Sequence, residues 1–474
     1  MNLPNLKDAK VRTKNQVHIK YGEYDIPENM ENIGHGKYYY ILTYGCQMNV
    51  HDSENISAIM EDMSYKKADD MENAHVIIVN TCAIRENAHN KVSGMLGRIK
   101  HLKNIKKDII VMFCGCMAQE ESVVNTLKEK YKWIDIIFGT HNIHKIPEYL
   151  SNVINNHERE INVYSIEGDI IENVPVKRDS NVKAWVNIMY GCDKFCTYCI
   201  VPYTRGKQRS RLPEDILSEC EELYNSNYQE VTLLGQNVTA YGKDLNINYN
   251  MANLLSDVAK IGIPRVRFIT SHPWDFTDEM IEVIAAYPNI MPYIHLPIQS
   301  GSDRILKLMG RKYNTKEYLE LVDKLRKKIP NVSITTDIIV GFPGETKEDF
   351  QKTLDIVNEV KYDLAYTFIF SPREGTPAAK MKDEVSMEEK KERLARLNEL
   401  INKYALISNE KMKDKTVDVL IISESDKKDK YMGYTENMKL VNVSCDDEFL
   451  GKIIPVKITE AKTWSLDGVV NDRK

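Results

Sequence analysis

Three cysteines stand close together near the middle of the chain, in the segment GCDKFCTYC (191–199). Cys192, Cys196 and Cys199 form a C-x3-C-x2-C pattern directly after a stretch typical of a β-strand. Iron–sulfur clusters are held by cysteine thiolates, and a four-iron cluster normally takes four of them. A zinc site would need a fourth Cys or His nearby, and this loop has none. The pattern therefore indicates a cluster with one iron left open to bind a substrate.

A second set of cysteines is spread over the first quarter of the chain. Its members are Cys46, Cys82 and Cys116, spaced by 36 and 34 residues. Their segments are TYGCQMN (43–49), NTCAIRE (80–86) and CGCMAQ (114–119). Each follows a predicted parallel strand, and ligands bind at the carboxyl edge of such sheets. The topology thus predicts a second cluster site. Cys114 competes with Cys116, which we prefer because Cys114 comes directly after the predicted strand, where we expect the chain to be still packed.

The elements that position the N-terminal cysteines alternate between strands and helices. Predicted strands of the N-terminal region are 37–42, 74–79, 108–113 and 134–139. This alternation favours a parallel sheet with helices on both faces, which we assign to residues 36–152. Residues 1–35 are expected to form a flexible leader, and residues 153–183 a linker with a short strand near 161–166.

Six further strand–helix units predict a (βα)6 partial barrel over residues 184–409. The predicted strands are 184–190, 230–235, 265–270, 293–298, 333–341 and 363–370. Residues 410–474 contain short alternating strands at 416–423, 439–445 and 452–460, which predict a small β-barrel. The fold class is therefore multidomain α/β with a C-terminal β-barrel.

Composition limits the class of protein. The chain has 474 residues, 42% hydrophobic and 28% charged, which is ordinary for globular domains and excludes disordered and collagen-like proteins. No apolar run approaches the ~18 residues of a membrane span, and we expect no secretion signal and a cytoplasmic location. Clustered cysteines in such a chain indicate metal ligands before disulfides. A net charge of −5 limits nucleic-acid contacts to local basic patches.

The C-x3-C-x2-C segment resembles the signature of radical S-adenosylmethionine enzymes. Further segments resemble the methylthiotransferase family within that superfamily, and the likeness runs from about residue 37 to the end. They are TYGCQMN, HDSE (51–54), NTCAIRE, GCMAQ, GCDKFCTYCIVPYTRG (191–206), HLPIQSGSDRIL (295–306) and the C-terminal barrel, which resembles a TRAM domain.

The resemblance implies cofactors and the residues that hold them. We expect two [4Fe-4S] clusters, on Cys46, Cys82 and Cys116 and on Cys192, Cys196 and Cys199, together with S-adenosyl-L-methionine. The expected S-adenosylmethionine contacts are Tyr198, Gly235, Gln236, Asn237, Thr335 and Asp337, with the GFPGET loop (341–346) nearby. Packing within a loop or barrel is the alternative for each of these six.

The resemblance also implies an activity. We expect a 2-methylthio group to be added to N6-isopentenyladenosine 3′ of the tRNA anticodon, at position 37, with two S-adenosylmethionine molecules consumed. The alternatives are action on threonylcarbamoyladenosine of tRNA, action on a ribosomal protein, or a non-catalytic iron–sulfur redox sensor that binds RNA. No P-loop lysine motif or G-x-S-x-G elbow supports phosphoryl transfer or hydrolysis.

Contacts to tRNA are expected from local basic stretches. The segment RGKQRSR (205–211) follows the central cysteines and supplies Arg205, Lys207, Arg209 and Arg211. In the C-terminal domain the candidates are Lys427, Lys428, Lys430, Lys439 and Lys462, although residues 410–474 hold 12 basic against 13 acidic residues. Other expected partners are a reductant protein such as flavodoxin or ferredoxin and a sulfur donor that the sequence does not identify. We expect a monomer.

Overall fold

The computed structural model describes residues 21–83, 86–163, 170–427 and 430–471. The chain divides into two compact units. Unit 1 comprises residues 1–179, 189–195 and 199–211, and unit 2 comprises residues 180–188, 196–198 and 212–474.

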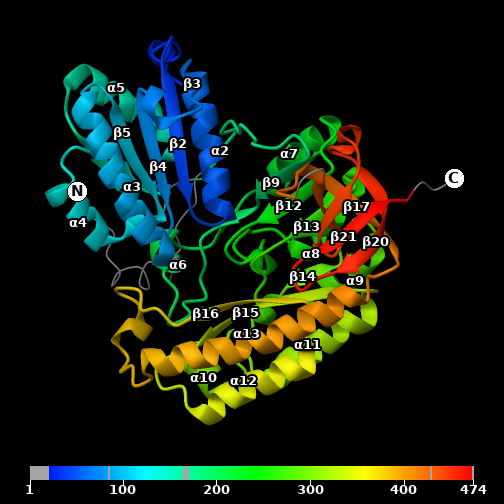
Figure 1. Ribbon diagram of the computed structural model, residues 1–474. Coiled ribbons are helices and arrows are strands. Elements are labelled where there is room, and N and C mark those ends of the chain that lie inside the picture. The colour runs from blue at the N-terminus through cyan, green and yellow to red at the C-terminus, as the bar shows by residue number, and fades with distance from the viewer. Residues whose placement is uncertain (1–20, 84–85, 164–169, 428–429, 472–474) are drawn as a thin grey trace. The chain divides into compact units, whose positions relative to one another are not determined.

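Unit 1 is built on a six-stranded parallel sheet in the order β3-β2-β4-β5-β6-β7. Its strands are β2 (Tyr38–Tyr44), β3 (Lys66–Lys67), β4 (Val76–Thr81), β5 (Ile110–Gly115), β6 (Ile136–Phe138) and β7 (Glu160–Asn162). Its helices are α2 (Gln47–Asp62), α3 (Glu86–Ile105), α4 (Glu121–Lys130) and α5 (Ile146–Asn156). The helices cover both faces of the sheet (Figure 1). This confirms the predicted parallel α/β domain.

Alternate residues of the central strands enter two separate cores, because side chains along a strand point to opposite faces. Ile77 packs with residues of α3 and α4, whereas Ile78 packs with residues of α2 and α5. Such strands are buried on both faces and therefore appear as continuous apolar runs in the sequence.

Part of the predicted leader belongs to this folded unit. β1 (Tyr21–Glu23) pairs in parallel with β8 (Ile170–Glu172), and Met30 is fully buried in the core. The expectation of a flexible leader over residues 1–35 is therefore wrong for residues 21–35, and residues 1–20 lie outside the described part. The linker also contributes strands, because β7 joins the main sheet and β8 pairs with β1.

Unit 2 contains the six predicted strands as two three-stranded parallel sheets, β13-β12-β9 and β14-β15-β16. The strands are β9 (Lys183–Asn187), β12 (Glu230–Leu234), β13 (Arg265–Phe268), β14 (Tyr293–His295), β15 (Ser333–Val340) and β16 (Leu364–Ile369). The helices are α7 (Pro213–Asn225), α8 (Met251–Ile261), α9 (Asp278–Ala286), α10 (Asp303–Leu308), α11 (Thr315–Lys328), α12 (Lys347–Val360) and α13 (Met387–Glu410). The N–H of Val266 donates to the carbonyl of Asn289, and its carbonyl accepts from the N–H of Met291, just before β14. Backbone hydrogen bonds therefore extend from one sheet toward the other.

The C-terminal strands close into a barrel in the order β17-β18-β19-β21-β20. They are β17 (Thr416–Glu424), β18 (Tyr431–Thr435), β19 (Leu440–Ser444), β20 (Ile453–Ala461) and β21 (Leu466–Val470). The predicted small barrel is confirmed. β18 and β21 were missed because their short runs include Gly433 and Gly468, at which a Cβ would lie within 2.6 Å of a neighbouring strand.

This barrel contacts the amino-terminal ends of the central strands. Arg265, the first residue of β13, donates to the carbonyls of Tyr434 (2.7 Å) and Asp418 (2.9 Å). The Asn437 amide donates to the carbonyl of Asn331, two residues before β15 (2.7 Å). Ligands of such barrels bind at the opposite, carboxyl ends of the strands. The small barrel and the expected S-adenosylmethionine residues after β12 therefore lie at opposite strand ends.

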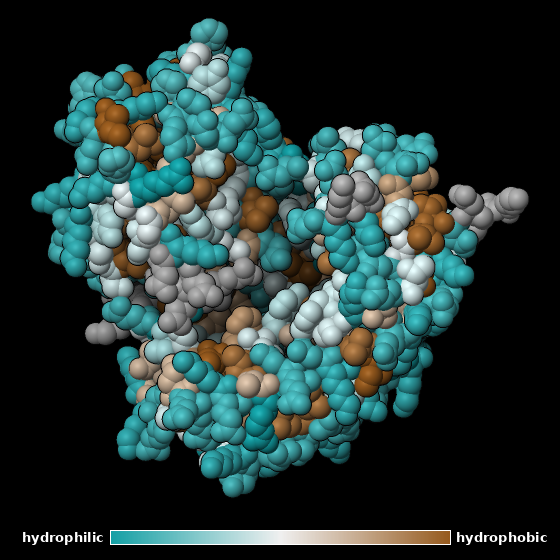
Figure 2. Space-filling view, in the orientation of Figure 1, coloured by the Kyte–Doolittle hydropathy of each residue, from teal (hydrophilic) through white to brown (hydrophobic). Residues whose placement is uncertain are grey.

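Among the described residues, no helix combines the length and apolar character that a membrane crossing requires. Hydrophilic residues form most of the visible surface in the space-filling view, with apolar residues in separate patches (Figure 2).

Candidate functional site

The three N-terminal cysteines follow three neighbouring strands. Cys46 comes after β2 and caps the N-terminus of α2, Cys82 comes after β4, and Cys116 begins a 3-10 helix after β5. Because these strands are adjacent and parallel, their carboxyl ends meet at one edge. The fold therefore delivers three residues distant in sequence to the same edge.

The Cys46 thiol lies in surroundings that favour its thiolate. A hydrogen bond with Cys82 lowers its pKa, burial raises it, and the Arg205 guanidinium and the backbone at the start of α2 lower it again, to about 6. Metal-binding cysteines act as thiolates, so these surroundings suit a cluster ligand.

A buried amide network fixes the segments that carry these cysteines. The Asn49 amide donates to the Asn80 side chain and to the carbonyl of Thr81, both at 3.1 Å. Asn80 returns donations to the carbonyl of Asn49 and the hydroxyl of Ser53, both at 2.9 Å. TYGCQMN, HDSE and NTCAIRE are thus tied together by fully buried polar side chains, which sequence patterning did not predict.

The Arg205 side chain lies inside unit 1. It is buried, and it donates through Nε to the Cys116 sulfur (3.3 Å) and through Nη2 to Asp52 (2.5 Å). Arg209 is also buried, and Arg211 forms an ion pair with Glu172 (2.6 Å). These side chains make contacts inside unit 1, and the contact of the three arginines with tRNA stays a prediction. Lys207 is partly exposed and its contact with tRNA stays a prediction.

The choice between Cys114 and Cys116 agrees with the packing. Cys114 lies within β5 and packs in the core with Ile78 and Phe138, and burial raises the pKa of its thiol. Burial raises the pKa of Cys116 as well, but this thiol contacts Arg205, whose positive charge acts to lower it. The structure favours Cys116 as the ligand, although the assignment stays a prediction.

The loop that carries the central cysteines turns sharply at its start. Gly191 has a φ of +72°, and a Cβ there would lie 2.1 Å from the carbonyl oxygen of Lys207. The next residue, Cys192, donates its N–H to the carbonyl of Gly206 (3.1 Å). Glycine is therefore required at position 191, because the backbone of Gly206 and Lys207 lies too close for a side chain there.

Arg311 contacts the middle cysteine of this loop and was not predicted. It is buried and donates to the sulfur of Cys196 (3.4 Å) and to the carbonyl of Pro297 (2.8 Å). Its position five residues after HLPIQSGSDRIL was the available signal. Each cysteine set thus has one thiol that accepts from a buried guanidinium, an arrangement that stabilises negatively charged sulfur.

Among the residues that the structure describes, no three His, Cys, Asp or Glu side chains form a group that could hold a metal ion. The donor chemistry nevertheless fits iron–sulfur clusters, because both sets consist of thiols and each has an arginine to balance negative charge. The six cysteines therefore stay the predicted ligands.

Three residues expected to contact S-adenosylmethionine, Gly235, Gln236 and Asn237, follow β12. Both polar atoms of the Gln236 side chain are shielded from solvent and have no hydrogen-bond partner in the structure. Asn237, in contrast, is satisfied internally, since it donates to Asp275 (2.7 Å) and accepts from Thr239 (2.8 Å). A buried unsatisfied amide is costly. Gln236 is thus better suited to bind a ligand than Asn237. The carbonyl of Gly235 accepts a hydrogen bond from the Thr270 hydroxyl (2.7 Å).

The remaining expected contacts lie on one face of the second sheet or beside it. His295 bridges Thr335 (3.0 Å) and Asp337 (3.4 Å) through its two ring nitrogens. Asp337 keeps partial exposure and Thr335 is buried. Tyr198 packs against Met309 and neighbouring apolar residues. The roles of these residues toward S-adenosylmethionine stay predictions.

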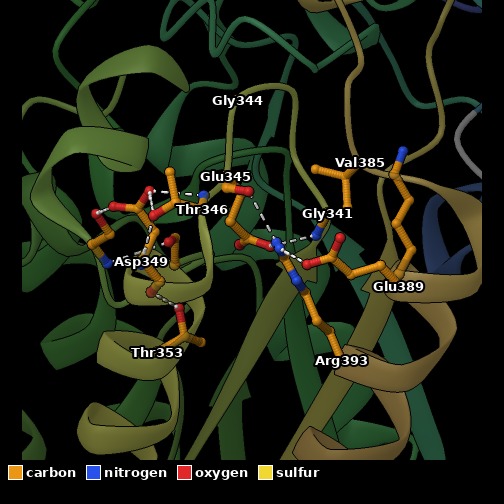
Figure 3. Close-up of polar contacts among 12 residues, drawn as sticks. Gly341, Gly344, Glu345, Thr346, Asp349, Thr353, Val385, Glu389 and Arg393 are labelled. Atoms are coloured by element: carbon orange, nitrogen blue, oxygen red, sulfur yellow. Dashed lines mark hydrogen bonds and ion pairs between the residues drawn. The ribbon is translucent and has the colours of Figure 1, made fainter.

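The GFPGET loop is held by two ion-pair networks (Figure 3). Glu345 accepts from the N–H of Gly341 (2.7 Å) and from Arg393 of α13 (2.6 Å). Asp349, near the start of α12, accepts from Ser302 (2.6 Å) and from Arg304. Hydrogen bonds and ion pairs from the HLPIQSGSDRIL segment and from α13 therefore hold this loop in place.

Three protein families match consecutive parts of the chain. The uncharacterized protein family UPF0004 matches residues 38–139, the radical SAM superfamily matches residues 186–357, and the TRAM domain matches residues 410–470. Among solved structures, the radical S-adenosylmethionine methyltransferase TsrM from Kitasatospora setae, with cobalamin and a [4Fe-4S] cluster bound, aligns with a TM-score of 0.53. That alignment has 13% identity and covers 72% of this chain and 77% of that one, so it supports the fold alone.

Curated relatives match nearly the whole chain. The tRNA-2-methylthio-N(6)-dimethylallyladenosine synthases of Bacillus pumilus and Bacillus subtilis are each 55% identical over 470 residues, which are 98% of this chain and 92% of theirs. The enzyme of that name from Staphylococcus aureus is 53% identical over 467 residues.

Fold, cysteine sets and domain order define a radical S-adenosylmethionine enzyme with an N-terminal UPF0004 domain and a C-terminal TRAM domain. Within that class, the chain belongs to the methylthiotransferase family of the tRNA-2-methylthio-N(6)-dimethylallyladenosine synthases. Members use S-adenosylmethionine and [4Fe-4S] clusters.

Proposed function

We propose that this protein adds a methylthio group to C2 of N6-dimethylallyladenosine 3′ of the anticodon in tRNA. The observation that carries the proposal is the 55% identity to synthases of this activity across 98% of the chain. The presence of two distinct three-cysteine sets in one chain supports it, because the reaction needs both a radical and a source of sulfur.

The chemistry explains why cysteine-bound clusters are suitable. The C2–H of the base is not acidic, so acid–base groups alone would not replace it. A cluster held by Cys192, Cys196 and Cys199 would, together with S-adenosylmethionine, supply a carbon radical. A cluster held by Cys46, Cys82 and Cys116 would supply the sulfur, and a second S-adenosylmethionine would supply the methyl group.

The chain's own residues hold and orient these groups. Arg205 and Arg311 place positive charge against Cys116 and Cys196. The unpartnered Gln236 amide is suited to bind the polar end of S-adenosylmethionine. Glu345 and Asp349 hold the GFPGET loop in place through their hydrogen bonds.

The finer assignments belong to the same proposal. We expect the electrons to come from a small reductant protein such as flavodoxin or ferredoxin, and the protein to act as a monomer in the cytoplasm.

Nucleoside mass spectrometry of tRNA from cells lacking the protein tests this function. The 2-methylthio derivative should disappear and N6-dimethylallyladenosine should accumulate, and the gene should restore the derivative whereas its Cys199→Ala variant should not. If instead the threonylcarbamoyl derivative or a ribosomal protein loses methylthiolation, the substrate assignment is wrong. Unchanged methylthiolation of every substrate would support the non-catalytic alternative.

A further inference from the structure

One strand of the central domain exposes large aromatic side chains. Tyr366 and Phe368 of β16 are 48% and 50% exposed. Across the described residues of the other five central strands, no large hydrophobic side chain is exposed. Strands of parallel sheets are normally covered on both faces, so two adjacent uncovered aromatics are unusual. We refer to these two residues as the β16 aromatic face.

The opposite face of β16 is covered. Thr367 donates to Asn398 of α13 (2.6 Å), and Ala365 is buried. Since side chains alternate along a strand, Tyr366 and Phe368 point away from α13. Figure 1 shows α13 running along β16 on that covered side. The β16 aromatic face therefore belongs to the side of the sheet that helix packing leaves open.

Residues expected to contact S-adenosylmethionine share this side. Tyr366 lies directly opposite Asp337 in the β15–β16 register. Its ring meets the His295 ring edge-on, with centroids 6.0 Å apart, and His295 in turn contacts Thr335 and Asp337. The β16 aromatic face is thus continuous with the expected cofactor residues within unit 2.

We propose that Tyr366 and Phe368 bind the purine ring and the N6-dimethylallyl group of the substrate adenosine. This inference rests on the proposed function and adds the residues that select the substrate. An extruded base stacks on aromatic side chains, and its five-carbon apolar substituent needs apolar surface. The adjacent Asp337 carboxylate would repel the carboxylate of a threonylcarbamoyl group. The negative charge of Asp337 and the apolar surface of the two rings therefore both favour the dimethylallyl substrate.

The experiment compares anticodon stem-loop RNAs with and without the N6-dimethylallyl group, using the reconstituted full-length enzyme. The measured quantity is the ratio of kcat/KM for the two RNAs. Phe368→Asn and Tyr366→Ala should each lower this ratio by about tenfold or more, mainly through a higher KM for the dimethylallyl RNA. Phe368→Leu should retain most of the ratio because it stays apolar.

Two controls separate this inference from other effects. Tyr224→Ala removes an aromatic side chain on α7 of similar exposure, 46%, and should leave the ratio unchanged. Because the ratio compares two RNAs on the same enzyme, a general loss of cofactor binding lowers both rates and leaves the ratio unchanged. A ratio unchanged in both Phe368→Asn and Tyr366→Ala overturns the inference. A wild-type enzyme that does not methylthiolate the dimethylallyl RNA overturns the proposed function itself.

Discussion

Arg205 shows how strongly the surroundings of one residue determine its role. In the sequence it belongs to a basic stretch suited to phosphate contacts. In the fold it is buried between Asp52 and the sulfur of Cys116. A buried guanidinium with a carboxylate partner can also donate to a thiolate, so this residue links HDSE to the third cysteine of the N-terminal set.

Replacing Arg205 by Met should have two effects. Leaving Asp52 buried without its partner should lower the free energy of unfolding by about 3–5 kcal/mol, measured by urea unfolding of the cluster-free protein. Loss of the donor to Cys116 should also reduce iron bound after reconstitution from about eight toward about four per chain.

Arg211→Met is the matched control, because it breaks another largely buried arginine–carboxylate pair in the same unit. It should destabilise the protein comparably and leave the iron content unchanged. Equal iron contents in the two variants would show that Arg205 has no particular role toward the N-terminal cluster.

At the scale of elements, Asp349 ties the start of α12 to the segment before α10. Burial raises the pKa of Asp349, but hydrogen bonds from Arg304, Ser302 and Thr346 outweigh burial and hold it well below its ordinary value. A depressed folded-state pKa means that the carboxylate stabilises the fold above the unfolded pKa of about 4, and that this stabilisation is lost as pH falls below it.

Asp349→Asn should therefore lower the urea midpoint at pH 7, and its difference from wild type should shrink as pH falls below about 4. Asp355→Asn, at an exposed position of the same helix, should show a small difference at every pH. A gap between Asp349→Asn and wild type that stays constant with pH would contradict this assignment.

Periodicity and cysteine spacing predicted most elements, but not the contacts that are distant in sequence. The apolar runs around Ile78 and Ile338 predicted buried parallel strands correctly. The pairing of β1 with β8 joins segments some 150 residues apart, which no local pattern signals. Arg205 and Arg311 gain their roles from sulfur atoms 89 and 115 residues away in sequence, so charge pattern alone could not separate them from surface arginines.

At the scale of the whole molecule, the two cysteine sets should be separable in function. Substituting Ala for Cys46, Cys82 and Cys116 should leave reductive cleavage of S-adenosylmethionine to 5′-deoxyadenosine measurable while abolishing methylthiolation. Substituting Cys192, Cys196 and Cys199 should abolish both. Cys445→Ala, in the C-terminal barrel, is the control. Methylthiolation by the N-terminal triple variant at a rate near wild type would contradict this division.

The C-terminal barrel should contribute to both RNA binding and stability. Deleting residues from Asp414 onward should weaken tRNA binding and also lower the Tm, because it uncovers Arg265 and the amino ends of the central strands. Arg265→Ala in the full chain should lower stability by about 1.5–3 kcal/mol and leave tRNA affinity nearly unchanged. Unchanged affinity in the truncated protein, or equal losses of affinity in both variants, would contradict a separate RNA-binding role.

The position of this barrel at the amino ends of the strands has a consequence for the length of RNA that the enzyme can use. Gly235, Gln236 and Asn237 follow the carboxyl end of β12, so an RNA that reaches both these residues and the barrel must extend along at least this strand, roughly 16 Å for five residues. We expect an RNA shorter than this distance to reach only one of the two places. A full tRNA should reach both at once, so its second contact would form at a high effective concentration and the two weak contacts together would give strong binding.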